Sequence, residues 1–485
     1  MSEQLQLLRD GPLAADEAAH RISDNGRSPR CPERTPEAVA IGKDETLPPP
    51  STGTVQSAGE SVEGGSCGAG PNSRAARIVH LAQQAPLLTD AELGELDCLL
   101  DRQINTASSK QMRAFLYDPP PAGCGFQKRW IKDGAKNTNK LSTSIDALLA
   151  NYRLKQDRRL ELCLLLSDRL TQCESLNCKL DKDGRIRFSL NLAGTKVGRA
   201  ACHASNTGSG YGLHSTQDRH KHLFRADPGF DFYSVDLAGA DSWTVAAECK
   251  ALGDPTMWLD LTAGLKPAKV LSLLYLEGSS VNSRPRDQLA SQCRALPKDW
   301  LYDSAKKACH GSAYGEAEVT MAETILRDSW QGGGKLVNVT AAQCRKLQSL
   351  FFQRYPGVKR RIERIKMLLQ RDGFLIAASG LKRDFFAPKN DHQTLKDALP
   401  FTPAANTAHC CNLALLKLWQ DRAEGVQPLL TVHDAILFQA PQAKRQGVAE
   451  RIPAWFANPI CVAGTTFTIP FEALRGPSWG QLEPL

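Results

Sequence analysis

Two aspartates, Asp236 and Asp434, each lie in a short apolar run that is typical of a β-strand. Asp236 lies in FYSVDLAGAD, and Asp434 follows His433 in LLTVHDAILF, whose two β-prone halves favour a hairpin with the acid near its turn. Two carboxylates that each lie on a strand suit a site for divalent metals, because Mg²⁺ takes oxygen ligands and leaves positions for substrate phosphates. Taken singly, each acid is equally well explained as an ordinary residue at the end of a strand.

A segment between these acids carries a second set of chemical groups. Lys306, His310 and Tyr314 follow one another at intervals of four residues, with Tyr302 one turn earlier, so that a helix would place them on one face. A lysine for phosphates and rings for a base and a sugar suit a nucleoside triphosphate. The glycines of this segment would let a planar group or a backbone come close. The alternative is an amphipathic helix that ends in a capping glycine.

The composition is that of a soluble intracellular protein. The net charge of +8 over 485 residues is compatible with a polyanionic partner but does not require one. The 15 cysteines lack the spacing of a zinc site, so free thiols in a reducing cytoplasm are expected. No apolar run is long enough to span a membrane, and the N-terminus does not resemble a signal peptide. We therefore expect no membrane partner.

The pattern of the chain changes near residue 75. The preceding tail is rich in Gly, Pro, Ser and Glu, and we expect it to be disordered. It is a candidate tether for a partner, although a dispensable tail is the favoured interpretation. Helical patterns follow, including one long helix with a basic face over Ile145–Cys173. A hairpin turn at Lys182–Gly184 is expected between two short strands.

The second half of the chain alternates between helical and β patterns. Residues 241–355 are mainly helical by pattern, and Pro356 begins a basic helix at its permitted first turn. A turn, a strand, the sequence GLKR and another helix lead to the Asp434 hairpin. An amphipathic helix over 441–457 and a terminal strand complete the pattern.

In this order, these stretches resemble the polymerase region of the family A DNA polymerases over roughly residues 105–480. VDLAGADSW resembles the first catalytic motif, Lys306 to Tyr314-Gly315 the fingers-helix motif, and TVHDA the third motif. GTKVGRA, FFQRYPGVKRRIE, ASGLKR and NTAHCCNLALLKLW resemble further segments of the family. The order and spacing of these motifs make the resemblance far more specific than any one of them.

The resemblance implies an α+β right-hand polymerase fold, with an antiparallel sheet in the palm and with helical fingers and thumb. The domains expected from it are a disordered tail (1–75), a helical thumb-like region (76–188), a first part of the palm (189–243), the fingers (244–355) and a second part of the palm (356–485). Fewer than about thirty foldable residues would precede the thumb, whereas a domain usually needs at least about 50. We therefore expect no proofreading exonuclease domain.

The resemblance also implies template-directed DNA synthesis in the cytoplasm of a bacterial or phage-infected cell, with primer–template DNA and dNTPs as partners; the N-terminal tail would then be a candidate contact for replication partners. Its expected catalytic residues are Asp236, Asp434 and Lys306; two Mg²⁺ ions, with Mn²⁺ as a substitute, would be held by Asp236, Asp434 and the carbonyl of Leu237. The expected dNTP-binding residues are Lys306, His310, Tyr314, Asp241 and Tyr302, with Asp241 screening out the 2′-hydroxyl, and the expected DNA-binding residues are Arg199, Lys382, Arg383, His409 and His433.

Four positions differ from the usual family pattern. Tyr302 replaces an arginine that contacts the triphosphate, His310 replaces the aromatic ring beside the sugar, Asp241 replaces a longer glutamate, and Ala435 replaces a glutamate after the catalytic Asp. The sequence HGSAYG is similar to a phage-type branch of the family. Two alternatives stay open: a single-subunit RNA polymerase, which the shorter Asp241 favours, and a non-catalytic nucleic-acid-binding relative, which Tyr302 and Ala435 favour.

Overall fold

The computed structural model describes residues 108–133, 136–165, 167, 180–181, 183–192, 194–206, 210–216, 218–333 and 335–485. The predicted tail over 1–75 and the first predicted helices therefore lie outside the described residues. The chain divides into two compact units, Met1–Arg77 and Ile78–Leu485, and every described residue belongs to the second. No helix in these described ranges is both long and apolar enough to cross a membrane.

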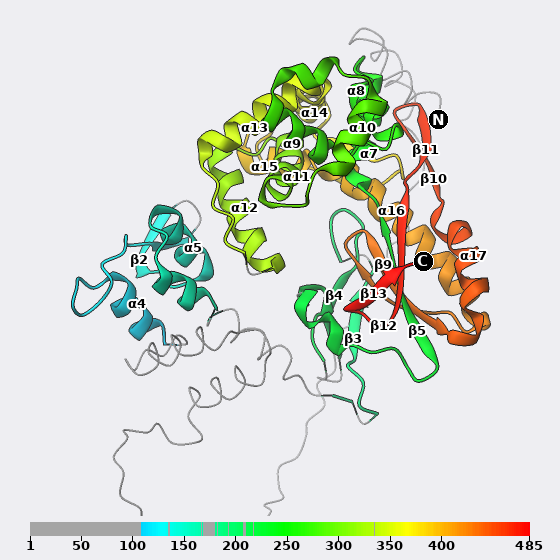
Figure 1. The fold of residues 1–485 in the computed structure, drawn as a ribbon, viewed down its shortest axis with the longest axis horizontal. Coiled ribbons are helices and arrows are strands. Elements are labelled where there is room, and N and C mark those ends of the chain that lie inside the picture. The colour runs from blue at the N-terminus through cyan, green and yellow to red at the C-terminus, as the bar shows by residue number, and fades with distance from the viewer. Residues whose placement is uncertain are drawn as a thin grey trace, which may run out of the picture. The chain divides into compact units, whose positions relative to one another are not determined.

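A five-stranded antiparallel sheet forms the centre of the fold (Figure 1). Its order is β13-β12-β5-β9-β8, so that β5 lies between β12 and β9. The strands are β5 (Phe230–Leu237), β8 (Gln427–Val432), β9 (Ala435–Pro441), β12 (Phe471–Ser478) and β13 (Gln481–Pro484). The predicted strand with Asp236, the predicted hairpin with Asp434 and the predicted class of mixed helices and antiparallel sheet are confirmed.

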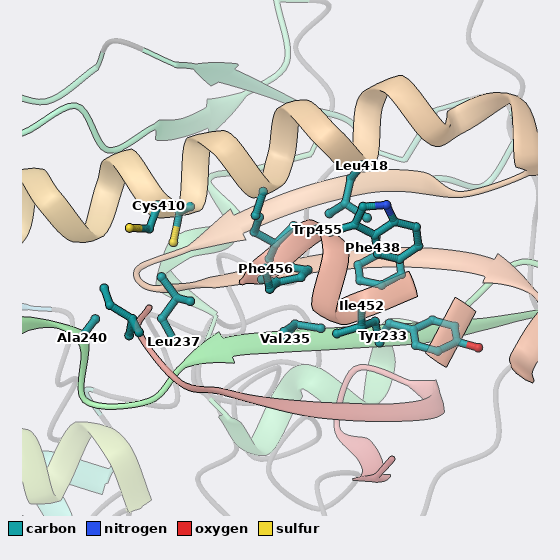
Figure 2. Close-up of a cluster of buried hydrophobic side chains, with 14 of the residues drawn as sticks. Tyr233, Val235, Leu237, Ala240, Cys410, Leu418, Phe438, Ile452, Trp455 and Phe456 are labelled. Atoms are coloured by element: carbon teal, nitrogen blue, oxygen red, sulfur yellow. The ribbon is translucent and has the colours of Figure 1, made fainter. Parts of the chain in front are cut away.

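The alternation of side chains along β5 fixes which face of the sheet is apolar. Tyr233, Val235 and Leu237 are buried and point toward helix α16 (Phe401–Gln420), as Figure 2 shows. The ring of Tyr233 stacks on Phe438 of β9 at 5.1 Å between centroids. Since Asp236 occupies an intervening position, it faces away from this core.

The apolar core beneath β5 also receives α17 (Arg445–Phe456), which supplies Ile452, Trp455 and Phe456 (Figure 2). This helix lies within the amphipathic segment predicted over 441–457, so the prediction is confirmed. Two helices, α16 and α17, therefore cover one face of the sheet and share a core with it. Asp236, on the opposite face, stays accessible.

A helical region follows β5, as the sequence predicts. Its helices are α7 (Ala240–Ala251), α8 (Thr256–Thr262), α9 (Pro267–Glu277), α10 (Arg286–Ala295), α11 (Trp300–Ala313), α12 (Glu318–Gly333), α13 (Ala341–Arg354) and α14 (Gly357–Asp372). Capping defines several of their ends: Asp299 accepts hydrogen bonds from the N–H groups of Leu301 and Tyr302, and Thr340 forms a capping box with Gln343. Gly373, in the left-handed region, ends α14.

The remaining elements are small. They are α4 (Ser109–Tyr117), β1 (Trp130–Asp133), β2 (Lys136–Leu141), α5 (Ile145–Leu154), β3 (Phe188–Asn191), β4 (Ala201–Ala204), β6 (Phe374–Ile376), β7 (Lys382–Asp384), α15 (His392–Ala398), β10 (Pro459–Val462) and β11 (Thr465–Thr468). Short 3₁₀ turns lie at Leu213–Ser215, Asp218–Leu223, Ser279–Ser283, Asp421–Glu424 and Gln442–Lys444. The pairs β1–β2, β3–β4, β6–β7 and β10–β11 form separate two-stranded antiparallel sheets.

One local prediction was wrong. The long helix predicted over Ile145–Cys173 is interrupted, because α5 ends at Leu154 and the backbone over 155–157 is not helical. Asp157 starts a new helical turn there by accepting a hydrogen bond from the N–H of Arg159. The strand expected before the turn at Gly184 falls almost entirely outside the described residues, and the strand after the turn forms as β3, which pairs with β4.

A buried carboxylate connects three helices. The side chain of Asp260 in α8 is fully buried and accepts hydrogen bonds from the guanidinium of Arg354 at 2.9 and 3.0 Å, from Arg286 at 2.9 Å and from the hydroxyl of Tyr355 at 3.0 Å. These partners belong to the ends of α10 and α13 and to the turn after α13. Because both oxygens are satisfied, this buried charge fixes the relative positions of the helices.

Arg361 of α14 makes a similar connection. Its buried guanidinium contacts Glu248 of α7 and donates to the carbonyl oxygen of Leu399 at 3.0 Å. Thr402 of α16 donates to the other oxygen of the same glutamate at 2.8 Å. The contact joins α7, which follows β5, to α14 and α16, so it holds the end of β5 in a defined place.

We predict that Asp260→Ala lowers the free energy of unfolding by about 3–5 kcal/mol, since it leaves Arg354 buried without a counter-charge. Chemical denaturation measures this change. The matched control is Asp287→Ala, an exposed acid at the start of α10, which should cost less than about 1 kcal/mol. Equal effects of the two substitutions would contradict the role of burial.

Candidate active site

The two predicted catalytic aspartates lie at adjacent strand ends. Asp236, near the end of β5, pairs directly with Ala435, the first residue of β9, and Asp434 immediately precedes that residue. The N–H of Leu237 donates to the carbonyl oxygen of Asp434 at 3.1 Å. The sheet register therefore brings two acids that are far apart in the sequence to the same end of two adjacent strands.

The turn that carries Asp434 has an uncommon backbone. β8 and β9 are joined by only two residues, His433 and Asp434, and His433 has φ of +53°. Two-residue hairpins need positive φ at the first central position, where glycine is usual, although histidine enters this region more readily than most residues. Partial burial and the positive charges of Arg199, His214 and Lys221 lower the pKa of His433. The tight turn thus holds Asp434 at a fixed point.

Burial and mutual repulsion disfavour the ionised form of both acids. Burial raises the pKa of Asp434 to about 6, with a further increase from Asp241 and Asp236, while Arg199 opposes the shift. Burial and then the charge of Glu472 raise the pKa of Asp236, and Lys306 opposes that shift. Carboxylates under such repulsion gain free energy when a cation is bound between them.

Glu472 is a third carboxylate that the sequence did not reveal. It lies in β12 directly opposite Asp236, whereas Ala435 faces Asp236 from β9 on the other side. Opposite residues in adjacent strands present their side chains on the same face of a sheet. Glu472 also forms an exposed ion pair with Lys266 at 3.2 Å. No sequence motif marks this residue, because its position depends on the register of β12.

Asp241 lies at the start of α7, where two hydroxyl groups and the side chains of Arg199 and His310 surround it. Its Oδ2 accepts a hydrogen bond from the hydroxyl of Tyr314 at 2.8 Å, and its Oδ1 accepts one from Thr407 at 3.0 Å. Arg199 and His310 lie 4.0 and 3.8 Å away. Burial alone would raise the pKa of Asp241, but His310, Arg199 and Tyr314 together hold it below its usual range. Asp241 is therefore ionised at neutral pH.

The predicted nucleotide-binding helix forms as α11, but its four residues differ in their surroundings. Lys306 and His310 are exposed, and Lys306 lies close enough to Asp236 to lower its pKa. Tyr314 follows the last residue of the helix, and its ring meets His310 edge to face at 4.5 Å. Tyr302 instead packs against the helical core, with the ammonium of Lys269 5.0 Å from the centre of its ring.

The glycines of this segment have structural explanations. A Cβ atom at Gly311 would lie 2.3 Å from Oε2 of Glu316, so this glycine allows the turn after α11 to fold back on the helix. Gly315 has φ of +71°, which other residues rarely adopt. At Gly311 the group that comes close is part of the protein itself, because the side of the residue that lacks a Cβ faces Glu316 and Met321.

The predicted DNA-binding residues fall into two groups. Arg199 donates to Oδ1 of Asp434 at 2.6 Å, and its Nε is buried with no hydrogen-bond partner among the described residues. His433 lies in the turn beside Asp434. His409 lies further along α16, one turn before Asn412, whose amide donates to the carbonyl oxygen of Gly198 at 3.1 Å. Arg199 and His433 therefore lie beside the carboxylates, and His409 lies on α16.

Lys382 and Arg383 lie in the separate hairpin of β6 and β7. Lys382 pairs with Asp384 at 3.0 Å and lies over the ring of Phe374, whereas Arg383 pairs with Asp397 at 2.6 Å. The hairpin core includes Val197, which precedes the segment with Arg199. Both cations thus have carboxylate partners within the protein.

Metal ligands are sparse at this site. Within the residues that the structure describes, no group of three or more His, Cys, Asp or Glu side chains is arranged to hold a metal ion. Asp236 and Asp434 nevertheless fit a hard divalent cation, since both offer ionisable oxygens under mutual repulsion. Such a site would be completed by oxygens from a substrate.

Comparison with known proteins gives two similar sequences and a similar fold. No family model matches the chain. DNA polymerase I of Treponema pallidum (strain Nichols) is 22% identical over 400 residues, which cover 79% of this chain, and DNA polymerase theta of Drosophila melanogaster is 23% identical over 200 residues, which cover 38%. The chain is thus similar to these two DNA polymerases over the matched residues. It spans only 35% of the first relative's length and 9% of the second's.

The family A resemblance extends to the three-dimensional structure. The POL domain of Pol1 from M. smegmatis, solved in complex with DNA primer-template and dNTP, matches with a TM-score of 0.60 at 17% identity, over 84% of this chain and 66% of that one. This chain therefore has the fold of that POL domain, the right-hand polymerase fold, and the match covers the polymerase region.

We predict that Asp434→Asn stabilises the protein by about 2 kcal/mol at pH 8 in a buffer that chelates metals. Because folding raises the pKa of Asp434 from 3.8 to about 6, its ionised form destabilises the folded state above pH 6, and this cost disappears as the pH falls toward 3.8. Denaturation at pH 8 and pH 4.5 measures the difference, which should shrink at the lower pH. A variant less stable than the wild type at pH 8 would contradict the prediction.

Proposed function

We propose that this protein is a primer-dependent DNA polymerase that adds dNMP from dNTP to a primer 3′ end on a DNA template. One observation carries the proposal. The sheet places Asp236 next to Asp434, and Lys306 lies close enough to lower the pKa of Asp236. Both the acids and the lysine belong to segments that resemble the catalytic motifs of the family. In a non-catalytic relative, the repulsion between these carboxylates would cost stability without serving cation binding.

By the family mechanism, two divalent cations would bind, and we propose Mg²⁺. They would lower the pKa of the primer hydroxyl and neutralise charge on the triphosphate and the leaving pyrophosphate. Asp236, Asp434 and the carbonyl of Leu237 would hold them. Cation binding would relieve the repulsion that, together with burial, raises the pKa of both acids. The bound metal would also let the triphosphate approach these carboxylates.

The residues of α11 would bind the nucleotide. Lys306, exposed on the helix, would contact the phosphates and donate a proton to pyrophosphate as it leaves. His310 and Tyr314, in edge-to-face contact, would lie beside the sugar and the templating base. Tyr302 is packed against the helical core and Lys269, so we assign it a supporting role in α11 rather than direct contact with the triphosphate.

Primer and template would be held by cations and imidazoles that carry no sequence information. Arg199 and His433 lie beside the carboxylates, His409 lies on α16, and the buried, unpartnered Nε of Arg199 leaves it a donor for the primer end. Lys382 and Arg383 would act from the β6–β7 hairpin. Contacts to phosphates and to the minor groove suit an enzyme that copies any sequence.

A single-subunit RNA polymerase is the second candidate, because Asp241 is one methylene shorter than the usual glutamate. The two hydrogen bonds that hold its carboxylate favour discrimination nevertheless. Incorporation of rNTP and dNTP on the same primed template distinguishes the two enzymes.

We predict that the wild-type protein extends a primer with Mg²⁺ and that Asp236→Ala and Asp434→Ala each reduce the rate by about a thousandfold or more, since each removes a ligand for the cations. Gel-based primer extension measures the rate. The control is Asp287→Ala, which removes an exposed acid of α10 and should be fully active. The proposal would be refuted if the wild type and both active-site variants were equally inert with Mg²⁺ and with Mn²⁺.

Glu472 offers the carboxylate that Ala435 lacks, from the opposite neighbour of Asp236. We predict that Glu472→Gln raises the Mg²⁺ concentration needed for half-maximal extension by about tenfold, because it removes negative charge beside the cations. The matched control is Glu483→Gln in β13, where an exposed glutamate lies opposite Arg475. Identical Mg²⁺ titrations of the two variants would show that Glu472 is an ordinary surface residue.

A further inference from the structure

Asp241 is held by a residue that no catalytic motif contains. Tyr314, which follows α11, donates to one carboxylate oxygen, and Thr407, within α16, donates to the other. We propose that Thr407 positions Asp241 and thereby determines how strongly the site discriminates between deoxyribonucleotides and ribonucleotides. This inference rests on the proposed polymerase function and adds to it a specificity-determining residue.

The direction of the hydrogen bond follows from the chemistry of the two groups. An ionised carboxylate only accepts hydrogen bonds, so the hydroxyl of Thr407 must donate. A threonine hydroxyl has one hydrogen, and within a helix it often bonds to a carbonyl of the preceding turn. The hydroxyl of Thr407 instead lies 3.0 Å from Oδ1 of Asp241. Its single donor is thus committed to the neighbouring helix α7.

Thr407 is rigidly placed. It is fully buried, and the adjacent Asn406 accepts a hydrogen bond from the N–H of Ala378 at 3.0 Å. α16 is a helix of 20 residues that packs against both α7 and the sheet. A donor on such an element holds its partner more accurately than a donor on a loop.

The short side chain of Asp241 makes this support necessary. Aspartate reaches less far from the backbone than the usual glutamate, so its carboxylate can exclude a 2′-hydroxyl only from a fixed position. Without the Thr407 donor, Oδ1 would be free to turn toward Arg199, which lies 4.0 Å away. The carboxylate would then leave the space beside the sugar, and a ribonucleotide would meet less resistance.

The chain contains a matched control for this contact. Thr402, in the first turns of the same helix, also donates to a carboxylate of α7, that of Glu248, at 2.8 Å. Both threonines are buried and both bonds join α16 to α7. Thr402 and Glu248 belong to the Arg361 contact and not to the nucleotide site. A purely structural effect of losing a threonine donor should therefore be equal at the two positions.

The test compares kcat/KM for a dNTP and for the matching rNTP in single-nucleotide primer extension. Thr407→Val, which keeps the shape but removes the donor, should reduce the dNTP/rNTP ratio on the order of tenfold. Thr407→Ser, which keeps the donor, should retain the wild-type ratio, and so should Thr402→Val. If Thr407→Val does not fold by thermal melting, Thr407→Ala takes its place.

A double-mutant cycle shows whether Thr407 acts through Asp241. In an Asp241→Ala background, Thr407→Val should cause no further change in the ratio. An unchanged ratio in Thr407→Val, an equal loss in Thr402→Val, or additive losses in the double variant would each overturn the inference. A wild-type protein that incorporates neither dNTP nor rNTP would instead refute the proposed function, so the two failures are distinguishable.

Discussion

The pairing of β5 with β9 is the interaction on which the candidate site depends. Asp236 lies opposite Ala435, and the backbone bond from Leu237 to Asp434 closes the end of the ladder. A slip by one residue would turn every side chain of β5 to the other face. The stack of Tyr233 on Phe438 and the core below α16 prevent such a slip, because it would bury Asp236 and expose aromatic rings. The apolar face therefore specifies the position of the polar one.

The fold accepts an electrostatic cost at this edge. Asp236, Asp434 and Glu472 repel one another, and the tight turn at His433 adds an uncommon backbone conformation. Buried ion pairs elsewhere hold the elements around the site, as Asp260 does among the helices and Arg361 does between α7, α14 and α16. The carboxylates that repel one another thus lie where we propose that a cation and a substrate bind. The fully hydrogen-bonded charges of Asp260 and Arg361 lie instead where they connect helices.

The contrast between α11 and α16 suits the proposed site, in which one helix would bind the nucleotide and the other would support its selection. α11 presents exposed groups, Lys306 and His310, which are free to meet a ligand. α16 presents a buried hydroxyl, Thr407, that acts on Asp241 and never needs to touch a ligand itself. The same helix covers the core beneath the sheet, so selection of the sugar and stability of the palm-like sheet share one element.

The sequence by itself determined the elements whose pattern is local: the apolar run of β5, the hairpin around Asp434, the spacing in α11 and the amphipathic segment of α17. The helical pattern failed at the break after α5, where the Asp157 side chain begins a new helical turn. It also did not identify β4 as the partner of β3. Only the tertiary structure revealed Glu472 and Thr407, because their roles follow from sheet register and helix packing, which bring together residues that no spacing in the chain relates. It also showed that Gly311 serves packing and that Tyr302 faces the core, since burial is a property of the whole fold.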